Sequence, residues 1–571
     1  MPRSPDFLIY GVNDKPPLVK LLLLGFQHVL LMAVYLVIVV LVVREAHAPE
    51  EIIRSAISMG MIALAISTVL QALTKGPIGS GYLAAPVVSA IFLEPSLLAA
   101  HKGGLALVFG MTIFAGIIEI IMSRFIHRLR AFFPPGISGL IITIVGIQLG
   151  ILSISKMFEI NIAPHSYIHE EVFIAGLTLF IMISLSVWWH GAARLMCSFW
   201  GLTIGFLIAL VFGLIPQTSL QTFRDIPFFA FPHFNYISYH FDTTLIVPFL
   251  IAGIAASLRT VGVITTCQRI NDADWKRPNI KTIEGGMLAD SIGCLLAGLF
   301  GVPGINTSPS LVGLSKAAGA TSRYIAFSVA FILVVLAFLP QITNIFLILP
   351  PYIIGAALLF TSSFMIVGGI QIMGARNIDT RMTYVIGLAL LFGISRRVFP
   401  HFYESLPYVV QLFSNTTLSL TIVIAIVLNL IFRIGIKQKA TLEFEGIEKI
   451  SLNQVRDFII QRGSGWDIDQ ELLERCVITA TSVIKHLREA NLILYGIKIT
   501  IVYDQIDLVI AINYRGDLLV LPFVGQQKEV LLEEESFAYG LGDFLTGVYP
   551  DRFEAKKVNE ESIITFGFVT A

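Results

Sequence analysis

The stretch FPPGISG at residues 133–139 returns as LPPYIIG at residues 349–355. The offset between the two is 350 − 134 = 216 residues. A second pair of matching segments, near 79–94 and 304–318, begins after prolines at a similar offset of 303 − 77 = 226 residues. Both of these segments are apolar but short, and glycine, proline and serine interrupt them. Self-similarity at such a spacing predicts an internal structural repeat.

The composition divides the chain into a membrane part and a water-soluble part. Hydrophobic residues make up 55% of the 571 residues and charged residues only 14%, whereas a typical soluble domain has about 25% charged residues. Charges are sparse up to Lys437 and ordinary after it. The expected domains are a cytoplasmic segment 1–18, a first inverted repeat 19–217, an extracytoplasmic loop 218–243, a second inverted repeat 244–435 and a cytoplasmic α/β domain 436–571.

A helix needs about 20 apolar residues to cross a bilayer. By this criterion the membrane part contains twelve candidate spans. They lie near 19–43, 54–73, 103–123, 133–151, 172–189, 199–215, 244–267, 284–301, 322–339, 342–371, 382–396 and 416–434. The two interrupted segments raise the total to fourteen. Each half then holds seven spans, an odd number, so the halves must have opposite orientations. This predicts an all-α membrane region built as an inverted repeat, as in many secondary transporters.

Charge in the loops predicts the orientation in the membrane. Loops assigned to the inside are richer in Lys and Arg than loops assigned to the outside, which carry acids such as Glu50 and Glu170. This asymmetry follows the positive-inside rule. We therefore expect a multi-pass protein of the inner (plasma) membrane with both termini in the cytoplasm, and we interpret residues 1–18 as a lead-in without a signal-peptide cleavage site.

Several classes of function are disfavoured by composition. Four widely spaced cysteines, without a CxxC pair, predict neither a metal site nor a disulfide framework. A formal net charge of zero gives no indication of nucleic-acid binding. We expect no enzymatic activity, no catalytic residues and no cofactor. The interrupted segments instead indicate a substrate site, because backbone leaves helical form inside a bilayer only where protein or a cavity receives it. Opposed helix N-termini would direct positive dipole ends to one point.

Several motifs resemble those of the nucleobase–ascorbate transporters, the family of uracil and xanthine permeases. The matching stretches are Gly25-Phe26-Gln27-His28, Ile78-Gly79-Ser80-Gly81, Glu119 with Ser123-Arg124-Phe125, Phe133-Pro134-Pro135 with Gly139, Leu288-Ala289-Asp290 with Gly293, Asn306-Thr307, and Thr321-Ser322-Arg323-Tyr324. The resemblance covers roughly residues 19–435. It implies fourteen spans in a core domain and a gate domain, elevator-like alternating access, and a homodimer.

The sequence departs from this family at its substrate-binding positions. Where the family usually has a Glu that binds the nucleobase and couples protons, this chain has Arg259, and Val263 stands at the position of the Asp that follows. The third span has Ser89-Ala90 in place of Ser-Phe, and the tenth has a serine-rich run in place of Gln or Glu followed by Asn. The resemblance assigns substrate binding to Gln27, His28, Ser89, Ala90, Arg259, Ser308, Pro309 and Ser310, and an architectural or proton-path role to Glu119 and Asp290.

Arg259 has two interpretations. With two positive helix ends, a guanidinium favours an anionic cargo such as urate, a xanthine anion, a carboxylate or an inorganic oxyanion. Alternatively, Arg259 extends to the cytoplasmic face or pairs with a buried acid such as Asp290. His28 titrates in a useful range, although a histidine on an apolar span is often only hydrogen-bonded.

The soluble tail has the pattern of a small α/β domain. A helix is expected at 469–490, and strands at 497–503, 508–514 and 563–569. Before the last strand come Gly540-Leu541-Gly542 and an apolar helix, and this order weakly resembles the histidine-kinase-like ATPase fold. Ser482 stands in place of the Mg²⁺-holding Asn of that fold, and Asn513-Tyr514-Arg515 in place of its DxG motif, so ATP hydrolysis is not expected. A cytoplasmic protein or a nucleotide is the candidate partner of the tail.

Three functions follow from these observations. The first is secondary transport of nucleobases, in a neutral or an anionic form. The second keeps the fold and changes the cargo to a small organic or inorganic anion. The third is a membrane sensor that does not transport and that signals through the C-terminal domain.

Overall fold

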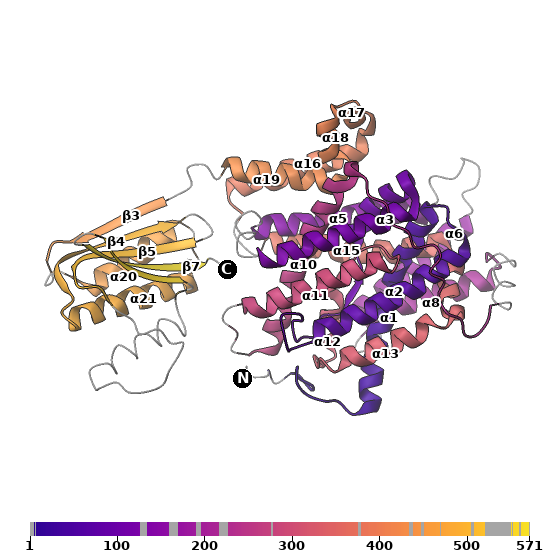
Figure 1. Cartoon of the computed structure of the whole chain (residues 1–571), viewed down its shortest axis with the longest axis horizontal. Coiled ribbons are helices and arrows are strands. Elements are labelled where there is room, and N and C mark those ends of the chain that lie inside the picture. The colour runs from indigo at the N-terminus through magenta and orange to yellow at the C-terminus, as the bar shows by residue number, and fades with distance from the viewer. Residues whose placement is uncertain are drawn as a thin grey trace. The chain divides into compact units, whose positions relative to one another are not determined.

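The computed structural model consists of two compact units, Met1–Asn429 and Leu430–Ala571, and each is described here by itself (Figure 1). The structure describes residues 5, 7–125, 134–158, 169–189, 194, 196–215, 226–273, 275, 278–374, 378–432, 438–446, 450–466, 468, 470–503, 507–519, 550, 552–558 and 561–569. Phe133 of the first repeated motif and Gly540–Gly542 of the tail lie outside these residues.

The first unit is almost entirely helical. Its first half contains α1 (Leu18–Glu45), α2 (Glu50–Ala72), β1 (Pro86–Val88), the 3-10 helix η1 (Ala90–Phe92), α3 (Leu93–Arg124), α5 (Pro135–Met157), α6 (His169–Trp188) and α8 (Cys197–Val211). Its second half contains η2 (Thr243–Leu245), α10 (Ile246–Asn271), α11 (Ile280–Leu299), β2 (Ile305–Thr307), α12 (Pro309–Ala317), α13 (Ile325–Ala337), α14 (Pro340–Ile348), α15 (Pro351–Met373), α16 (Thr380–Val398), α17 (Pro400–Glu404), α18 (Tyr408–Ser414) and α19 (Thr417–Phe432).

Many of these helices can cross a membrane. Among the described residues, eight helices are long and apolar enough, or up to ten if each of two bent helix pairs is counted as one span. Their number and their apolar surfaces define a polytopic membrane protein, because only helices of this kind satisfy all backbone hydrogen bonds within the hydrocarbon layer.

One predicted span is wrong. Residues 342–371 do not form a single helix, because α14 ends at Ile348 and α15 begins at Pro351. Proline lacks the N–H group that would continue the preceding helix, and its ring disfavours helical geometry in the residue before it. The short α14 instead forms a bent pair with α13, with an angle of 81° between the two helices.

Helix contacts divide the first unit into two bundles. In the first bundle α1, α2, α3, α10, α11, α12 and α13 pack on one another around β1 and β2. In the second bundle α5 and α15 form the most extensive helix pair, and α6, α8 and α16 pack around them. Helix α19 joins the second bundle through Thr421, which lies against Gly393 of α16. Contacts between the two bundles are sparse by comparison.

The repeated motif explains how α5 and α15 pack. A Cβ atom added at Gly139 would lie 2.5 Å from the carbonyl oxygen of Gly369, and one added at Gly355 would lie 2.7 Å from that of Ser153. These two contacts are equivalent by the repeat offset, since 139 + 216 = 355 and 153 + 216 = 369. The motif glycine of α5 thus lies against Gly369 of α15, and the motif glycine of α15 lies against Ser153, the equivalent position of α5. A twofold relation between the two helices produces this reciprocal packing.

The second unit is a small sheet domain. Its described elements are β3 (Gln438–Phe444), α20 (Leu452–Gly465), α21 (Gln470–Glu489), β4 (Ile493–Tyr503), β5 (Asp507–Gly516), β6 (Arg552–Val558) and β7 (Glu561–Val569). The strands form one five-stranded sheet in the order β3-β4-β5-β7-β6, and every described pair is antiparallel. Alternate residues of the sheet pack with the apolar faces of α20 and α21, which lie on one side of it (Figure 1).

Candidate substrate site

Two short strands from the interrupted segments meet inside the first bundle. Strand β1 pairs antiparallel with β2, and Val87 lies opposite Asn306 at the centre. Two further backbone bonds extend the pair, from the N–H of Ser89 to the oxygen of Gly304 (3.0 Å) and from the N–H of Ser308 to the oxygen of Ala85 (3.1 Å). Because the strands are antiparallel, the helices that follow them begin at opposite ends of the pair and run in opposite directions.

Asp290 fixes β2 in place. Its carboxylate accepts hydrogen bonds from the hydroxyl of Thr260 (2.6 Å), the backbone N–H of Thr307 (2.9 Å) and the amide of Asn306. The same Asn306 amide also bonds to the carbonyl oxygen of Ala256 (3.0 Å). Asp290 is only 1% exposed, and both of its oxygens are occupied. These hydrogen bonds join α10 and α11 to the strand.

Arg259 lies on α10 next to this network, beside the start of η1, the 3-10 helix that follows β1. Its Nη1 is 3.5 Å from the Ser89 hydroxyl, which also accepts from the N–H of Ile91 at 3.3 Å. Within the described part of the chain, no carboxylate lies within ion-pair distance of Arg259. Asp290 and Arg259 therefore form no ion pair, although their charges act on each other through space. An arginine inside a membrane protein without a carboxylate at ion-pair distance is energetically expensive.

The start of α12 presents a line of hydroxyl groups. The hydroxyl of Ser308 lies 2.8 Å from that of Ser310, which lies 3.0 Å from the hydroxyl of Tyr35 on α1. Pro309 and Ser310 are exposed, whereas Ser308 is buried. The N–H groups in the first turn of a helix have no partner within that helix, so this end of α12 offers hydrogen-bond donors and a positive dipole end.

Tyr35 was not among the residues expected from the sequence. It follows His28 by seven residues, which is about two helical turns, so both side chains lie on the same face of α1. This spacing is the signal that could have identified Tyr35 once His28 was assigned to the site.

The two residues expected on α1 have different surroundings. His28 is fully buried, with Nδ1 2.8 Å from the carbonyl oxygen of Leu24 and Nε2 2.9 Å from the hydroxyl of Ser315 on α12. The Nε2 contact thus joins α1 to α12, whereas the Nδ1 contact lies within α1. The side-chain oxygen of Gln27 is buried and accepts no hydrogen bond from the described residues.

Glu119 lies on α3, outside the strand pair. It is 1% exposed, and no N–H or O–H group of the described residues donates to its carboxyl oxygens. Its chain packs against Gly253 of α10, and Cys294 of α11 lies beside it. The structure therefore does not bring Glu119 into contact with the other predicted site residues.

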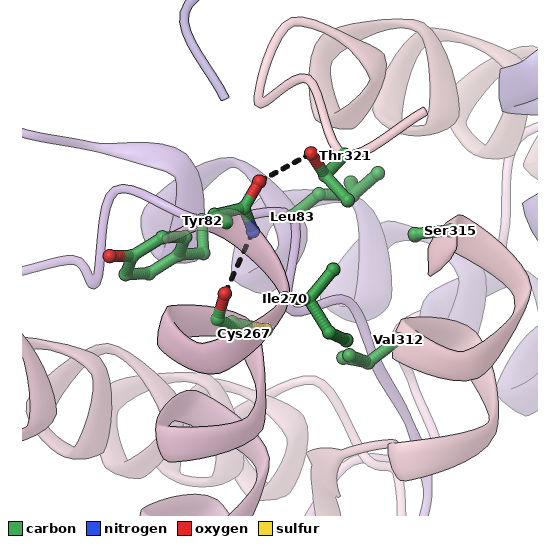
Figure 2. A pocket seen from close by; sticks show the side chains of 8 residues that line it. Tyr82, Leu83, Cys267, Ile270, Val312, Ser315 and Thr321 are labelled. Atoms are coloured by element: carbon green, nitrogen blue, oxygen red, sulfur yellow. Dashed lines mark hydrogen bonds between the residues drawn. The ribbon is translucent and has the colours of Figure 1, made fainter. Parts of the chain in front are cut away.

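A small cavity lies two to three turns along α10 from Arg259, between α10 and α12. Its lining includes Cys267, Ile270 and Val312, and Figure 2 shows Ile270 and Val312 side by side. Thr321 donates a 2.5 Å hydrogen bond to Asn271 at the edge of this cavity. Its volume of about 10 Å³ is what one water molecule needs. A planar heterocycle therefore does not fit here.

The first unit is a helical membrane bundle in which two helices are interrupted, and the short strands at the interruptions pair beside Arg259. Discontinuous helices of this kind are typical of membrane transport proteins. The chain belongs to the nucleobase–ascorbate transporter family: residues 19–402 match the model described as the permease family. This confirms the family resemblance inferred from the motifs.

Curated relatives agree over most of their length. The chain is 26% identical over 444 residues to xanthine permease XanP of Escherichia coli (strain K12), covering 74% of this chain and 94% of that protein. It is 24% identical over 428 residues to the nucleobase transporter PlUacP of Paenibacillus larvae, covering 74% and 96%. Among solved structures, the murine Slc26a9 anion transporter in the inward-facing state has a TM-score of 0.50 at 10% identity, covering 76% of this chain and 71% of that one. This last likeness concerns the fold alone.

Proposed function

We propose that the chain is a secondary transporter that carries a nucleobase of the xanthine, uracil or urate type by elevator-like alternating access. The single observation that carries this proposal is the antiparallel pair of β1 and β2 beside Arg259, in a chain of the permease family. Strands of three residues leave polar backbone and two helix starts at one place inside the bundle. Relatives named as xanthine permeases and a nucleobase transporter support the cargo class.

The proposed topology has fourteen spans in two inverted seven-span repeats, with the domain boundaries given above. The reciprocal packing of Gly139 and Gly355 supports the twofold relation of the repeats. We place both termini in the cytoplasm of the inner membrane, propose a homodimer, and assign the first bundle as the moving core and the second as the gate. The C-terminal domain is proposed to dock a cytoplasmic protein or to bind a nucleotide.

Exposed positions follow one another along α10 and α12, starting from the site. On α10, Gly262, Thr266 and Arg269 follow Arg259 at helical spacing and are all exposed. On α12 the exposed positions include Ser310 and Gly313. A Cβ atom added at Gly262 or Gly313 would meet no atom within 4 Å. This supports a site that is open toward the face where α10 and α12 end.

The second candidate function is transport of a small organic or inorganic anion. The observation that favours it is that no carboxylate of the described residues lies within ion-pair distance of Arg259, since a ligand anion would supply that contact. An anionic form of a purine, such as urate, satisfies both candidates. The charge of the cargo and the role of Arg259 can therefore be tested together.

The experiment is uptake into proteoliposomes with purified full-length protein. Radiolabelled uracil, xanthine, hypoxanthine, urate and small carboxylates are compared, for wild type and for Arg259→Ala. Arg54→Ala is the matched control, because the described side-chain contacts of Arg54 are with Glu50 and Asn344, away from the strand pair. We expect saturable uptake of a purine, its loss in Arg259→Ala and its retention in Arg54→Ala. Uptake of carboxylates alone would favour the second candidate, and absence of any flux would exclude both.

A further inference from the structure

Polar links between the two bundles gather at one end of the first unit. The carboxylate of Glu94, on α3 of the first bundle, accepts a 2.6 Å hydrogen bond from the side-chain amide of Gln148 on α5 of the second bundle. A further link joins the amide of Asn415, which precedes α19, to the carbonyl oxygen of Thr244 at the start of α10 (3.2 Å). The exposed positions on α10 described above lie toward the opposite end of that helix.

Glu94 also caps a helix of the other bundle. One of its oxygens accepts from the backbone N–H of Thr417 (3.3 Å), the first residue of α19. Thr416 caps the same helix through the N–H of Ser419 at 3.1 Å. An anion at a helix N-terminus is stabilised by the unpaired N–H groups and by the helix dipole. Here that anion comes from a helix 323 residues away in sequence.

The described hydrogen bonds of the Glu94 side chain come from donors of the second bundle. Gln148 is 8% exposed and Thr417 3%, so the partners of Glu94 are shielded from water. Buried hydrogen bonds of this kind are costly to leave unmade, and all of them must break if the first bundle moves away from the second at this end.

We propose that Glu94 is a latch: its carboxylate closes the boundary between the two bundles at the end opposite the open face, and its release accompanies opening at that end. This inference rests on the proposed alternating access, because only a protein that opens at both ends needs the boundary to separate. The latch acts through position and hydrogen bonding.

The test measures which end of the protein is open. Ser310→Cys, at the start of α12, serves as the reporter, and the four native cysteines are all buried. The full-length protein is reconstituted in vesicles of both orientations and labelled with a membrane-impermeant maleimide. The ratio of labelling from the two sides is compared for the reporter alone, for Glu94→Gln and for Gln148→Leu. Glu50→Gln is the control, because Glu50 is an exposed acid paired only with Arg54 on its own helix among the described residues.

We expect Glu94→Gln to shift the labelling ratio toward the latched end by about tenfold, the effect of losing one hydrogen bond to a charged group. Gln148→Leu is expected to shift it in the same direction, and the double variant to shift it by less than the product of the two. An unchanged ratio in both single variants, with the protein monodisperse and labelled as before from the open side, would overturn the latch.

The outcome is independent of the cargo. Labelling reports accessibility without any substrate, so a shifted ratio supports the latch even if no nucleobase is transported. Conversely, nucleobase uptake by the wild type combined with an unshifted ratio leaves the proposed function intact and rejects the latch alone.

Discussion

At the scale of single residues, the two charged groups nearest the strand pair have opposite surroundings. Asp290 accepts from three donors and is closed to ligands, whereas Arg259 has one long contact with Ser89. The sequence alone allowed these two residues to neutralise each other. Asp290 and Arg259 form no ion pair because the Asp290 carboxylate already accepts hydrogen bonds from two groups of β2. These are the side-chain amide of Asn306 and the backbone N–H of Thr307.

Replacement of Asp290 by Asn is expected to destabilise the first unit. Asn has one acceptor oxygen, and its NH₂ group would face a donor that now bonds to the carboxylate. We expect a loss of about 1–3 kcal/mol for each buried donor left without an acceptor. The apparent melting temperature of the purified protein is the measurement. Asp242→Asn, which breaks a partly exposed pair with Lys102 (2.6 Å), should cost at most about 1 kcal/mol, and equal shifts for the two variants would contradict the assignment.

His486 on α21 predicts a pH dependence of the C-terminal domain. Burial lowers the pKa of His486 below its ordinary value of 6.5, although Glu489 acts in the opposite direction. The unfolded chain therefore binds the proton more readily than the folded domain, so stability is full above pH 6.5 and falls as the pH decreases below it.

The measurement is hydrogen exchange of β4 and β5 in the full-length protein at pH 5.5 and 7.5, corrected for intrinsic exchange. We expect less protection at the lower pH in the wild type and a smaller difference in His486→Gln, which cannot titrate. The same pH difference in the variant would show that other groups are responsible.

At the scale of elements, small residues decide which helices come close. The pair of α5 and α15 depends on Gly139, Gly355 and Gly369, whose Cβ positions would overlap backbone atoms of the partner helix. Small residues at helix contacts are the usual means of close packing in membrane proteins. The repeated motif thus has two local effects. Its second proline is the first residue of each helix, and the glycine four residues later allows the backbone of the other helix to approach closely.

Gly355→Ala is expected to destabilise the second bundle. The new Cβ would lie 2.6 Å from the backbone nitrogen of Met157 and 2.7 Å from the oxygen of Ser153, and backbone cannot rotate away. We expect a loss of about 1–3 kcal/mol from overpacking, measured as a lower apparent melting temperature. Gly387→Ala is the control, because a Cβ there meets no atom within 4 Å and alanine favours a helix. A stable Gly355→Ala protein would mean that the two helices adjust.

At the scale of the whole molecule, the chain joins two units with separate hydrophobic cores. The sheet domain has its own cluster of buried residues from α20, α21 and the strands, and the division falls at Asn429 and Leu430. A unit with its own core is expected to fold without its neighbour.

Truncation after Lys437 is therefore expected to leave a folded membrane unit. We expect the shortened chain to purify as a monodisperse protein, with the apparent melting temperature of its helical unit and its uptake per molecule unchanged. Size-exclusion chromatography and the proteoliposome assay measure this. Aggregation of the shortened chain would show that the membrane unit depends on the C-terminal domain, and retained folding with lost uptake would assign that domain a part in transport.

The sequence by itself determined the membrane and soluble parts, the two interrupted segments and the family, because hydropathy, proline and short motifs are local properties of the chain. The strands expected at 497–503, 508–514 and 563–569 lie within β4, β5 and β7. Local reasoning was wrong at 342–371, where apolar character continued across the break that Pro350 and Pro351 impose on the backbone.

Only the tertiary structure decided which polar groups meet. Tyr35 bonds to Ser310 across 275 residues of sequence, and Glu94 caps α19 across 323. His28 was expected to bind substrate, and its ring contacts Leu24 on its own helix and Ser315 on α12. The physical reason is that a side chain in a low-dielectric bundle must find a partner wherever packing provides one. Packing between distant helices is not encoded in any short stretch of the chain.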